Sequence, residues 1–297
     1  MYKPEIDLGS VVAIDTHVHI EVDNAGRNAL PEAIIEASAK YFHADTDKPT
    51  LAQVADYYRE RRMAAVVFTV DATTALGGWA PNSSIDIIRE ASDHADVLIP
   101  FGSVDPHQGQ RAIDLAHSLV EEHGARGFKL HPTVQGFDPS DEQFAPLWSA
   151  FEELGLPVVV HTGQTGIGAG TPGAFGFKLK YSNPMLLDDV LAEHPGLTLI
   201  MAHPSVPWAD EQISVATHKT NAWIDLSGWS PKYFPPQLTR AANSYLQDRV
   251  LFGSDFPLLT PDRWLKDFAG LDLKDEVRTK ITKDNAVRLL GLQPVAE

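Results

Sequence analysis

Near its start the chain reads Val11-Val12-Ala13-Ile14-Asp15-Thr16-His17-Val18-His19, an apolar run short enough to form one buried strand. Seven further short apolar runs follow it along the chain. Parallel strands are covered on both faces and read as nearly continuous apolar segments, so we interpret all of these runs as parallel strands. The segments are residues 11–19, 64–70, 97–104, 125–131, 157–161, 197–203, 222–226 and 250–255.

Helical patterns separate the predicted strands, and this alternation indicates strand–helix–strand units with right-handed crossovers. Eight such units in 297 residues favour a closed (β/α)8 TIM barrel over an open α/β sheet, because no glycine fingerprint of a dinucleotide fold follows the first strand. No linker or repeat divides the sequence, so residues 1–297 are predicted to form a single domain. Two enlarged loops, residues 21–50 and 162–183, are expected on the catalytic face.

Local signals mark where several helices begin and end. Thr50 precedes an amphipathic pattern, and Ser140 with Gln143 three places later is typical of a capping box. The last helix is predicted over residues 274–290, with Gly291 as a left-handed cap after it.

Composition excludes several classes of protein. The chain has 24 Lys and Arg against 40 Asp and Glu, a formal charge of -16, and no Cys, so any metal must have nitrogen and oxygen ligands. The acidic balance argues against nucleic acid and anionic membrane surfaces as partners, since both require a basic face. No apolar run is long enough to span a bilayer and the first ten residues lack a leader pattern, so a cytoplasmic protein is expected.

The first predicted strand places two histidines two residues apart. Side chains alternate along a strand, so His17 and His19 should project to the same side, toward the barrel interior or its mouth. Two imidazoles directed at one point provide half of a metal site, although an isolated pair of this kind is more often a pair of hydrogen-bonded core residues.

Three more predicted strands end in a residue type that binds metals. The fifth, sixth and eighth strands terminate in His161, His203 and Asp255. The carboxyl ends of barrel strands meet at one face, so these groups are expected to converge there with the two histidines of the first strand. Imidazole nitrogens with one carboxylate suit zinc, with manganese, iron or cobalt as alternatives, and an open position for water would make such a site catalytic.

The fourth predicted strand carries Lys129 and His131 on one face. A lysine inside a barrel mouth is costly unless it is paired, deprotonated or modified. Three interpretations are open for Lys129: contact with a substrate carboxylate or phosphate, carboxylation with bridging of two metals, or a structural ion pair with an acid such as Asp15. His131 is expected to line the pocket rather than to bind metal.

The set of residues on strands one, five, six and eight is similar to that of the amidohydrolase superfamily. Four phrases, at residues 14–19, 127–132, 252–257 and 285–291, resemble its amidohydrolase-related branch, which includes aminocarboxymuconate semialdehyde decarboxylase and resorcylate decarboxylases. The resemblance covers nearly the whole chain and implies one divalent metal, zinc first and manganese second, with His203 beside it for acid–base chemistry. The implied ligands are His17, His19, His161 and Asp255.

Lys129 departs from the decarboxylase pattern and resembles the Lys-Leu-aromatic-Pro phrase of dihydroorotases, whose lysine is carboxylated. On that likeness Lys129 and His203 would hold a second metal. The surrounding phrases fit the mononuclear branch better, so one metal is expected.

Segments at residues 164–184, 225–236 and 260–264 are similar to a subgroup described as 4-hydroxyphenyl-β-ketoacyl-CoA hydrolases. Trp229 and Tyr233 can offer flat surfaces to an aromatic substrate, and these residues are equally typical of loop packing. Lys232 and Arg263 are candidate anion holders, and each alone is more often a solvated surface charge.

The first hypothesis is therefore a metal-dependent hydrolase that directs a metal-activated water at a carbonyl of a small aromatic substrate, such as C–C cleavage of a 4-hydroxyphenyl-β-ketoacyl-CoA. Asp255 would accept the proton of that water, and His203 would polarise the carbonyl or protonate the leaving group. The alternative is a non-oxidative decarboxylase of an aromatic or unsaturated carboxylic acid. An inactive ligand-binding barrel is a third hypothesis, and a homo-oligomer is expected.

Overall fold

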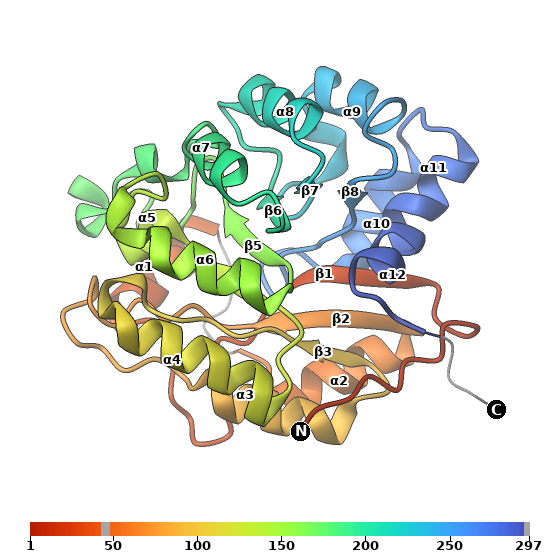
Figure 1. Cartoon of the computed structure of the whole chain (residues 1–297). Helices are drawn as coiled ribbons and strands as arrows, with labels where there is room; N and C mark the ends of the chain where they lie inside the picture. Colours follow the sequence, from red (N-terminus) through yellow and green to blue (C-terminus); the bar gives the residue numbers. More distant parts are fainter. Residues whose placement is uncertain (43–47, 294–297) are drawn as a thin grey trace.

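A computed structural model describes residues 1–42 and 48–293 of the chain, with helices around the outside of the strands (Figure 1). Within these residues eight strands follow one another in the order that the sequence predicts. Each strand ends at or before the last residue of its predicted segment. They are β1 (Ala13–His19), β2 (Met63–Phe68), β3 (Leu98–Pro100), β4 (Phe128–Leu130), β5 (Val158–His161), β6 (Leu199–Ala202), β7 (Ala222–Asp225) and β8 (Val250–Leu251).

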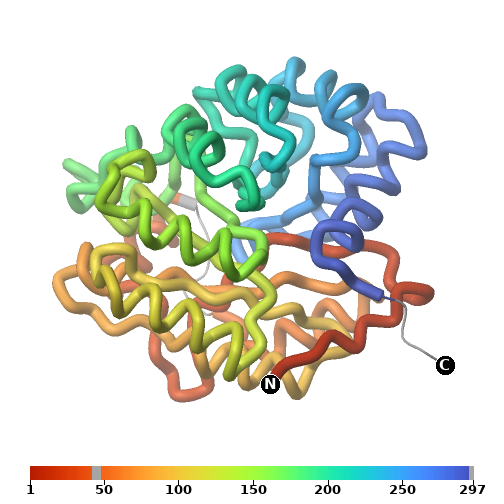
Figure 2. Tube along the Cα trace, viewed as in Figure 1, coloured from red at the N-terminus to blue at the C-terminus, as the bar shows by residue number. Residues whose placement is uncertain are grey.

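All neighbouring strands are parallel, in the orders β1-β2-β3 and β4-β5-β6-β7-β8. Backbone contacts join the two groups at both edges. Gly102, just after β3, pairs with Phe128 of β4, and the backbone N–H of Thr16 in β1 donates to the carbonyl of Phe252 after β8 over 2.9 Å. Figure 2 shows the resulting closure, with the red N-terminal and blue C-terminal segments side by side. The predicted (β/α)8 barrel is thereby confirmed.

Most of the α-helices cover the strands from outside, and the first α-helix lies in the loop that follows β1. The α-helices are α1 (Glu32–Phe42), α2 (Leu51–Glu60), α3 (Ser84–Ala91), α4 (Gln110–Ser118), α5 (Pro132–Gln135), α6 (Ala145–Leu154), α7 (Leu186–Glu193), α8 (Ala209–His218), α9 (Pro236–Ala242), α10 (Pro261–Ala269), α11 (Asp275–Thr279) and α12 (Asn285–Leu289). The shorter turns are η1 (Ser92–His94), η2 (Pro106–Gln108), η3 (Leu119–His123), η4 (Glu142–Phe144), η5 (Pro172–Gly176), η6 (Leu179–Ser182), η7 (Pro231–Tyr233) and η8 (Lys280–Asp284). Among the described helices, none combines the length and apolarity that crossing a bilayer requires.

The buried apolar side chains form two layers because side chains alternate along each strand. On β5, Val159 belongs to a cluster inside the barrel, whereas Val158 and Val160 pack in the larger cluster between strands and helices. This alternation decides which polar residues at the strand ends face the interior. His161 follows Val159 by two positions and therefore continues the inward row.

Most of the helix signals are confirmed, and one is wrong. Thr50 caps α2 in a capping box with Gln53, and Gly291, with a φ of 59°, follows Leu290, the capping residue at the end of the last helix. The Ser140–Gln143 capping box is absent. Asp141 is the cap instead, accepting from the Gln143 backbone N–H at 3.0 Å, because a carboxylate directly before the turn reaches this N–H in place of the hydroxyl.

Both loops predicted to be enlarged lie at the carboxyl ends of the strands. The loop over residues 21–50 contains α1, and its residues 43–47 lie outside the described part. The loop over residues 162–183 contains the turns η5 and η6. Both contribute side chains to the cavity described below.

Candidate metal centre and cavity

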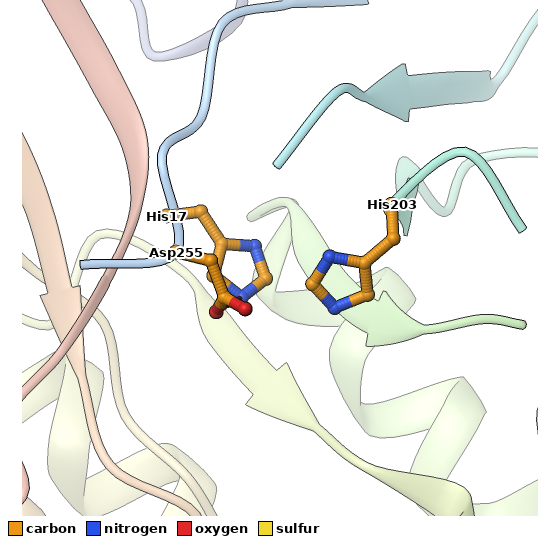
Figure 3. Close-up of side chains that lie close together, drawn as sticks. All are labelled: His17, His203 and Asp255. Atoms are coloured by element: carbon orange, nitrogen blue, oxygen red, sulfur yellow. Dashed lines mark ion pairs between the residues drawn. The ribbon is translucent and has the colours of Figure 1, made fainter. Parts of the chain in front are cut away.

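Three side chains from distant parts of the sequence meet at the carboxyl end of the barrel (Figure 3). His17, His203 and Asp255 each offer a ligand atom, and these atoms lie within 4.8 Å of one another. Two imidazole nitrogens and a carboxylate oxygen at such separations can hold a divalent ion. The predicted convergence of strand ends is therefore observed for these three residues.

His19 joins the same group through the carboxylate. Val18 packs outward in the layer between strands and helices, so the residues on either side of it, His17 and His19, face inward together as predicted. The Oδ1 atom of Asp255 lies 3.4 Å from Nε2 of His17 and 3.2 Å from Nε2 of His19. One carboxylate oxygen thus faces both histidines of the first strand.

His203 reaches the group through an unusual backbone conformation. Met201 packs in the outer layer, so strand alternation alone would direct His203, two residues later, away from the interior. Its φ of +73° places the backbone in the left-handed region and turns the imidazole inward, as Figure 3 shows. Asp255 has the same φ of +73°. Non-glycine residues in this region are strained, and such residues concentrate at functional sites.

His161 lies next to these residues, with its ring stacked on that of His131 at a centroid separation of 3.8 Å and an angle of 10°. Its ring centroid is 4.6 Å from that of His203. Nε2 of His161 is buried and has no hydrogen-bond partner among the described residues. Leaving a buried polar nitrogen unpaired is costly, so this atom, with the nearby imidazoles and carboxylate, fits a site that is completed by a metal ion.

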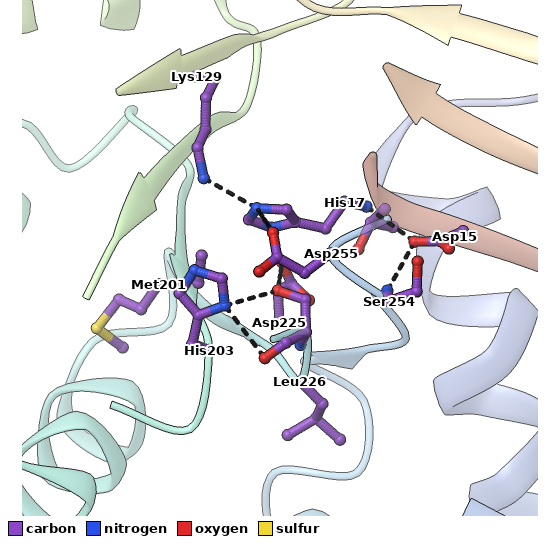
Figure 4. Close-up of polar contacts among 12 residues, drawn as sticks. Asp15, His17, Lys129, Met201, His203, Asp225, Leu226, Ser254 and Asp255 are labelled. Atoms are coloured by element: carbon purple, nitrogen blue, oxygen red, sulfur yellow. Dashed lines mark hydrogen bonds and ion pairs between the residues drawn. The ribbon is translucent and has the colours of Figure 1, made fainter. Parts of the chain in front are cut away.

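Two residues that our sequence reasoning did not assign to the site hold the other ring nitrogens in place, and Figure 4 labels one of them, Asp225. Asp225 at the end of β7 lies 2.5 Å from Nδ1 of His17, and Nδ1 of His203 lies 3.1 Å from the backbone carbonyl of Ser227. Asp225 could have been found from the sequence, because it is an acidic residue at the end of a predicted buried strand. No pattern in the sequence marked Ser227. Both contacts leave Nε2 as the ring atom that faces the group.

The protonation states of these groups favour metal binding. Burial lowers the pKa of four imidazoles, those of His17, His131, His161 and His203. Burial would raise the pKa of Asp255, but the hydrogen bond from His19 and the nearby imidazoles together hold it well below its usual range. Neutral imidazoles and an ionised carboxylate are the forms that coordinate metals. Burial also raises the pKa of Asp225, to about 6, so this carboxyl is largely ionised at neutral pH.

Lys129 lies on β4 with its Nζ atom 3.1 Å from Nε2 of His17. Its side chain is fully buried, and burial lowers its pKa to about 8. An ion pair with Asp15 is absent from the described structure. The Asp15 carboxylate accepts instead from the hydroxyl of Tyr58 at 2.7 Å and from the backbone N–H of Ser254 at 2.9 Å.

A cavity of about 670 Å³ opens above the histidines. Of the residues predicted to bind substrate, four contribute to its wall, and Lys129 and Lys232 do not. The four are His131, Trp229, Tyr233 and Arg263. Nζ of Lys232 instead lies 4.9 Å from the centroid of the Tyr233 ring. The wall also includes Lys48 and Glu21, which form an ion pair at 2.8 Å that our sequence reasoning did not find.

A protein-family model described as Amidohydrolase matches residues 14–292, which is nearly the whole chain. The match begins one residue inside β1 and includes the other seven strands and the histidines and acids of the site described above.

Solved structures are similar over the same length. An uncharacterized TIM-barrel protein from Bordetella bronchiseptica has a TM-score of 0.76 and 22% identity, with 94% of this chain and 98% of that chain covered. A dihydroxybenzoic acid decarboxylase from Polaromonas sp. JS666, solved with manganese and the inhibitor 2-nitroresorcinol, has a TM-score of 0.69 and 17% identity over 95% and 97% of the two chains. A manganese-bound 5-carboxyvanillate decarboxylase from Novosphingobium aromaticivorans has a TM-score of 0.64 and 14% identity over 97% and 100%. At these identities the likeness shows the fold.

Proposed function

Because the chain belongs to the amidohydrolase family, we propose that it is a metal-dependent, non-oxidative decarboxylase of a small aromatic carboxylic acid. The observation that carries this proposal is the position of an imidazole–carboxylate group beneath a cavity with aromatic side chains in its wall. Two of the similar structures, whose names are those of decarboxylases of hydroxylated benzoic acids, hold manganese. They favour decarboxylation over the hydrolysis that our sequence reasoning placed first.

The ligands of the ion in this proposal are His17, His19, His161 and Asp255. The unpaired Nε2 of His161 and the contacts of Asp255 with the other two histidines support this set. When bound there, a divalent cation acts as a Lewis acid on a carboxylate or phenolate oxygen of the substrate. The manganese in the similar structures supports manganese rather than zinc, although the donor set suits both.

His203 is the proposed acid–base residue. Its Nδ1 faces a backbone carbonyl, which can only accept, so Nδ1 carries the proton and Nε2 is free to accept one. Nε2 can take the proton of a substrate hydroxyl and return it to the ring carbon. The bond from this carbon to the carboxylate breaks, its electron pair takes up the returned proton, and carbon dioxide leaves.

Binding of the rest of the substrate is assigned to the cavity wall. Trp229 and Tyr233 offer flat faces to an aromatic ring, and Arg263 offers a cation to a second anionic group. 

The test is an assay of the purified, metal-analysed enzyme with 2,6-dihydroxybenzoate and 5-carboxyvanillate as first probes, in water enriched in oxygen-18. Release of carbon dioxide, with the label absent from the aromatic product, is the expected result. Because neither probe has an acyl bond that water could cleave, a metal-loaded preparation that releases no carbon dioxide from either one would overturn the decarboxylation of hydroxylated benzoic acids. A chain that turns over at full rate after chelation would overturn the metal dependence.

One observation favours a second candidate, hydrolytic C–C cleavage of a 4-hydroxyphenyl-β-ketoacyl thioester. The cavity of about 670 Å³ is several times the ~150 Å³ that suffices for benzene, so it has room for a ring with a long substituent. The same labelled-water assay with such a thioester separates the two candidates, because hydrolysis places one labelled oxygen in the acid product.

A further inference from the structure

The carboxylate of Asp225 is at the centre of a buried network that contacts two histidines of the site (Figure 4). Its Oδ2 atom lies 2.5 Å from Nδ1 of His17 and 3.0 Å from the hydroxyl of Ser227. Its Oδ1 atom accepts from the backbone N–H of Ser227 at 2.9 Å. Ser227 in turn contacts Nδ1 of His203 with its hydroxyl at 3.0 Å and with its carbonyl at 3.1 Å. Asp225 and Ser227 are both fully buried.

The direction of each hydrogen bond follows from what each atom can donate. An ionised carboxylate only accepts, so His17 donates from Nδ1 to Asp225 and the Ser227 hydroxyl donates its single proton to the same carboxylate. The hydroxyl is then left to accept from His203, whose Nδ1 also faces a carbonyl. These directions are consistent with one another: both imidazoles carry their proton on Nδ1, and the unprotonated Nε2 of each ring faces the site.

Packing around the network leaves space for these groups alone. A Cβ atom at Gly253 would overlap the carboxylate of Asp225. A Cβ atom at Gly228 would lie 2.6 Å from Nδ1 of His203, and the φ of +75° at that position is strained for any other residue. The network is therefore enclosed by positions at which a larger residue would displace it.

We propose that Asp225 is a positioning residue for two imidazoles at once, acting directly on His17 and through Ser227 on His203. This inference rests on the proposed function for its purpose, because it couples a metal ligand to the acid–base residue. A single carboxylate thus fixes the proton position of both rings and directs both Nε2 atoms at the site.

Two substitutions distinguish the direct effect of Asp225 on His17 from its effect on His203 through Ser227. In Asp225→Asn the amide has only one accepting oxygen. If that oxygen takes the Oδ1 position and keeps the bond from the Ser227 backbone N–H, the NH₂ group takes the Oδ2 position, faces His17 and must donate to it. We expect the His17 proton to move to Nε2 and the affinity for Mn²⁺ to fall about 10- to 100-fold. In Ser227→Ala the direct bond to His17 remains, while His203 loses the hydroxyl and keeps only the carbonyl.

The measurements are ¹⁵N NMR of the imidazole nitrogens in the chelator-treated full chain, and Mn²⁺ titration of the same samples. In Ser227→Ala we expect faster exchange of the His203 Nδ1 proton, with His17 unchanged and a smaller loss of Mn²⁺ affinity than in Asp225→Asn. The matched control is Ser84→Ala on α3, which also removes a buried hydroxyl that bonds backbone groups, those of Ser103, but lies outside the network. It should change neither readout.

The proposed direct effect on His17 is overturned if, in Asp225→Asn, His17 keeps its Nδ1 proton and the affinity for Mn²⁺ changes less than twofold. The relay is overturned if the His203 signals in Ser227→Ala match those of the wild type. If Asp225→Asn does not fold, Ser227→Ala still decides the relay, and the wild-type spectrum decides the proton position on His17. A wild-type chain that binds no Mn²⁺ would overturn the proposed function. The imidazole ¹⁵N spectra of His17 and His203 would still test the positioning role of Asp225.

Discussion

The side-chain nitrogen of Lys129 lies 3.1 Å from Nε2 of His17, and neither side chain reaches solvent. A protonated lysine at this distance opposes any cation that binds to the same imidazole. At an effective dielectric constant of about 20, two unit charges about 4 Å apart interact by ~4 kcal/mol. Lys129→Met should therefore raise the affinity for Mn²⁺ by about tenfold or more, with one ion per chain by elemental analysis. KM should change little, because Lys129 does not contribute to the cavity wall.

The competing interpretation of Lys129 makes a different prediction for the same variant. If Lys129 is carboxylated and bridges two metals, the wild type should contain two ions per chain and the variant one or none. Mass spectrometry under native conditions would then show the mass of an added carboxyl group in the wild type. Lys266→Met, which removes an exposed charge from α10, controls for the loss of a lysine at a distance.

The two histidines at the ends of β5 and β6 should differ in what their removal costs. His161→Ala should lose the bound ion and nearly all turnover, as Asp255→Ala should, because Nε2 of His161 has no other partner in the described structure. His203→Ala should keep the ion and lose turnover, because its proposed role is proton transfer. Metal content after gel filtration checks both. The reverse pattern would show that the compact group of His17, His203 and Asp255 is the ligand set.

The barrel was predictable because its strands are buried on both faces, which leaves eight apolar runs in the sequence. The inward direction of His17, His19 and His161 was also predictable, since each obeys the two-residue alternation of a strand. His203 was named from its place at a strand end, but alternation would have directed it outward. Only the backbone conformation at that residue, with a φ of +73°, explains its position in the site.

Other parts of the site were not accessible from sequence because they depend on three-dimensional packing. Ser227 contacts His203, which is 24 residues away in the sequence, and nothing in its local sequence distinguishes it from a loop serine. No sequence pattern favoured either Lys232 or Arg263 as the residue that binds an anion. Of the two, Arg263 contributes to the cavity wall and Lys232 does not. The difference arises from the start of α10, where residue 263 lies in the first turn beside the barrel mouth.

Arg263 should determine affinity for the anionic part of the substrate rather than the rate of the chemical step. Arg263→Gln removes a charged hydrogen bond of about 1.5–3 kcal/mol, so KM should rise roughly 10- to 100-fold with kcat nearly constant. Metal content should stay at the wild-type value. Lys266→Gln is the matched control, because Lys266 lies on the same helix but outside the cavity wall. A large fall in kcat with unchanged KM would contradict the binding role.

Asp15 should make the stability of the fold depend on pH in a predictable direction. Burial raises its pKa to about 7 from 3.8, although hydrogen bonds from Ser254 and Tyr58 partly oppose this rise. Between about pH 4 and 7 the native state therefore binds more protons at this site than the unfolded state, so its contribution to stability falls as pH rises through that window. Asp15→Asn has no such titration. Its free energy of unfolding relative to the wild type should increase from pH 4.5 to 8 by up to a few kcal/mol.

Urea denaturation of the chelator-treated protein at intervals from about pH 3 to about pH 8, a range that extends below the ordinary pKa of 3.8, measures that difference. The matched control is Asp248→Asn, which removes an exposed carboxyl and should give a nearly constant offset from the wild type. The direction in which this difference in free energy of unfolding changes with pH shows whether the native pKa of Asp15 is raised or lowered. A carboxyl stabilised in its ionised form by Tyr58 would have a lowered native pKa, and Asp15→Asn would then lose relative stability as pH rises through the unfolded-state value. Parallel curves for Asp15→Asn and the wild type would mean that burial and the three donors to this carboxylate, which include the backbone N–H of His17 at 3.1 Å, cancel.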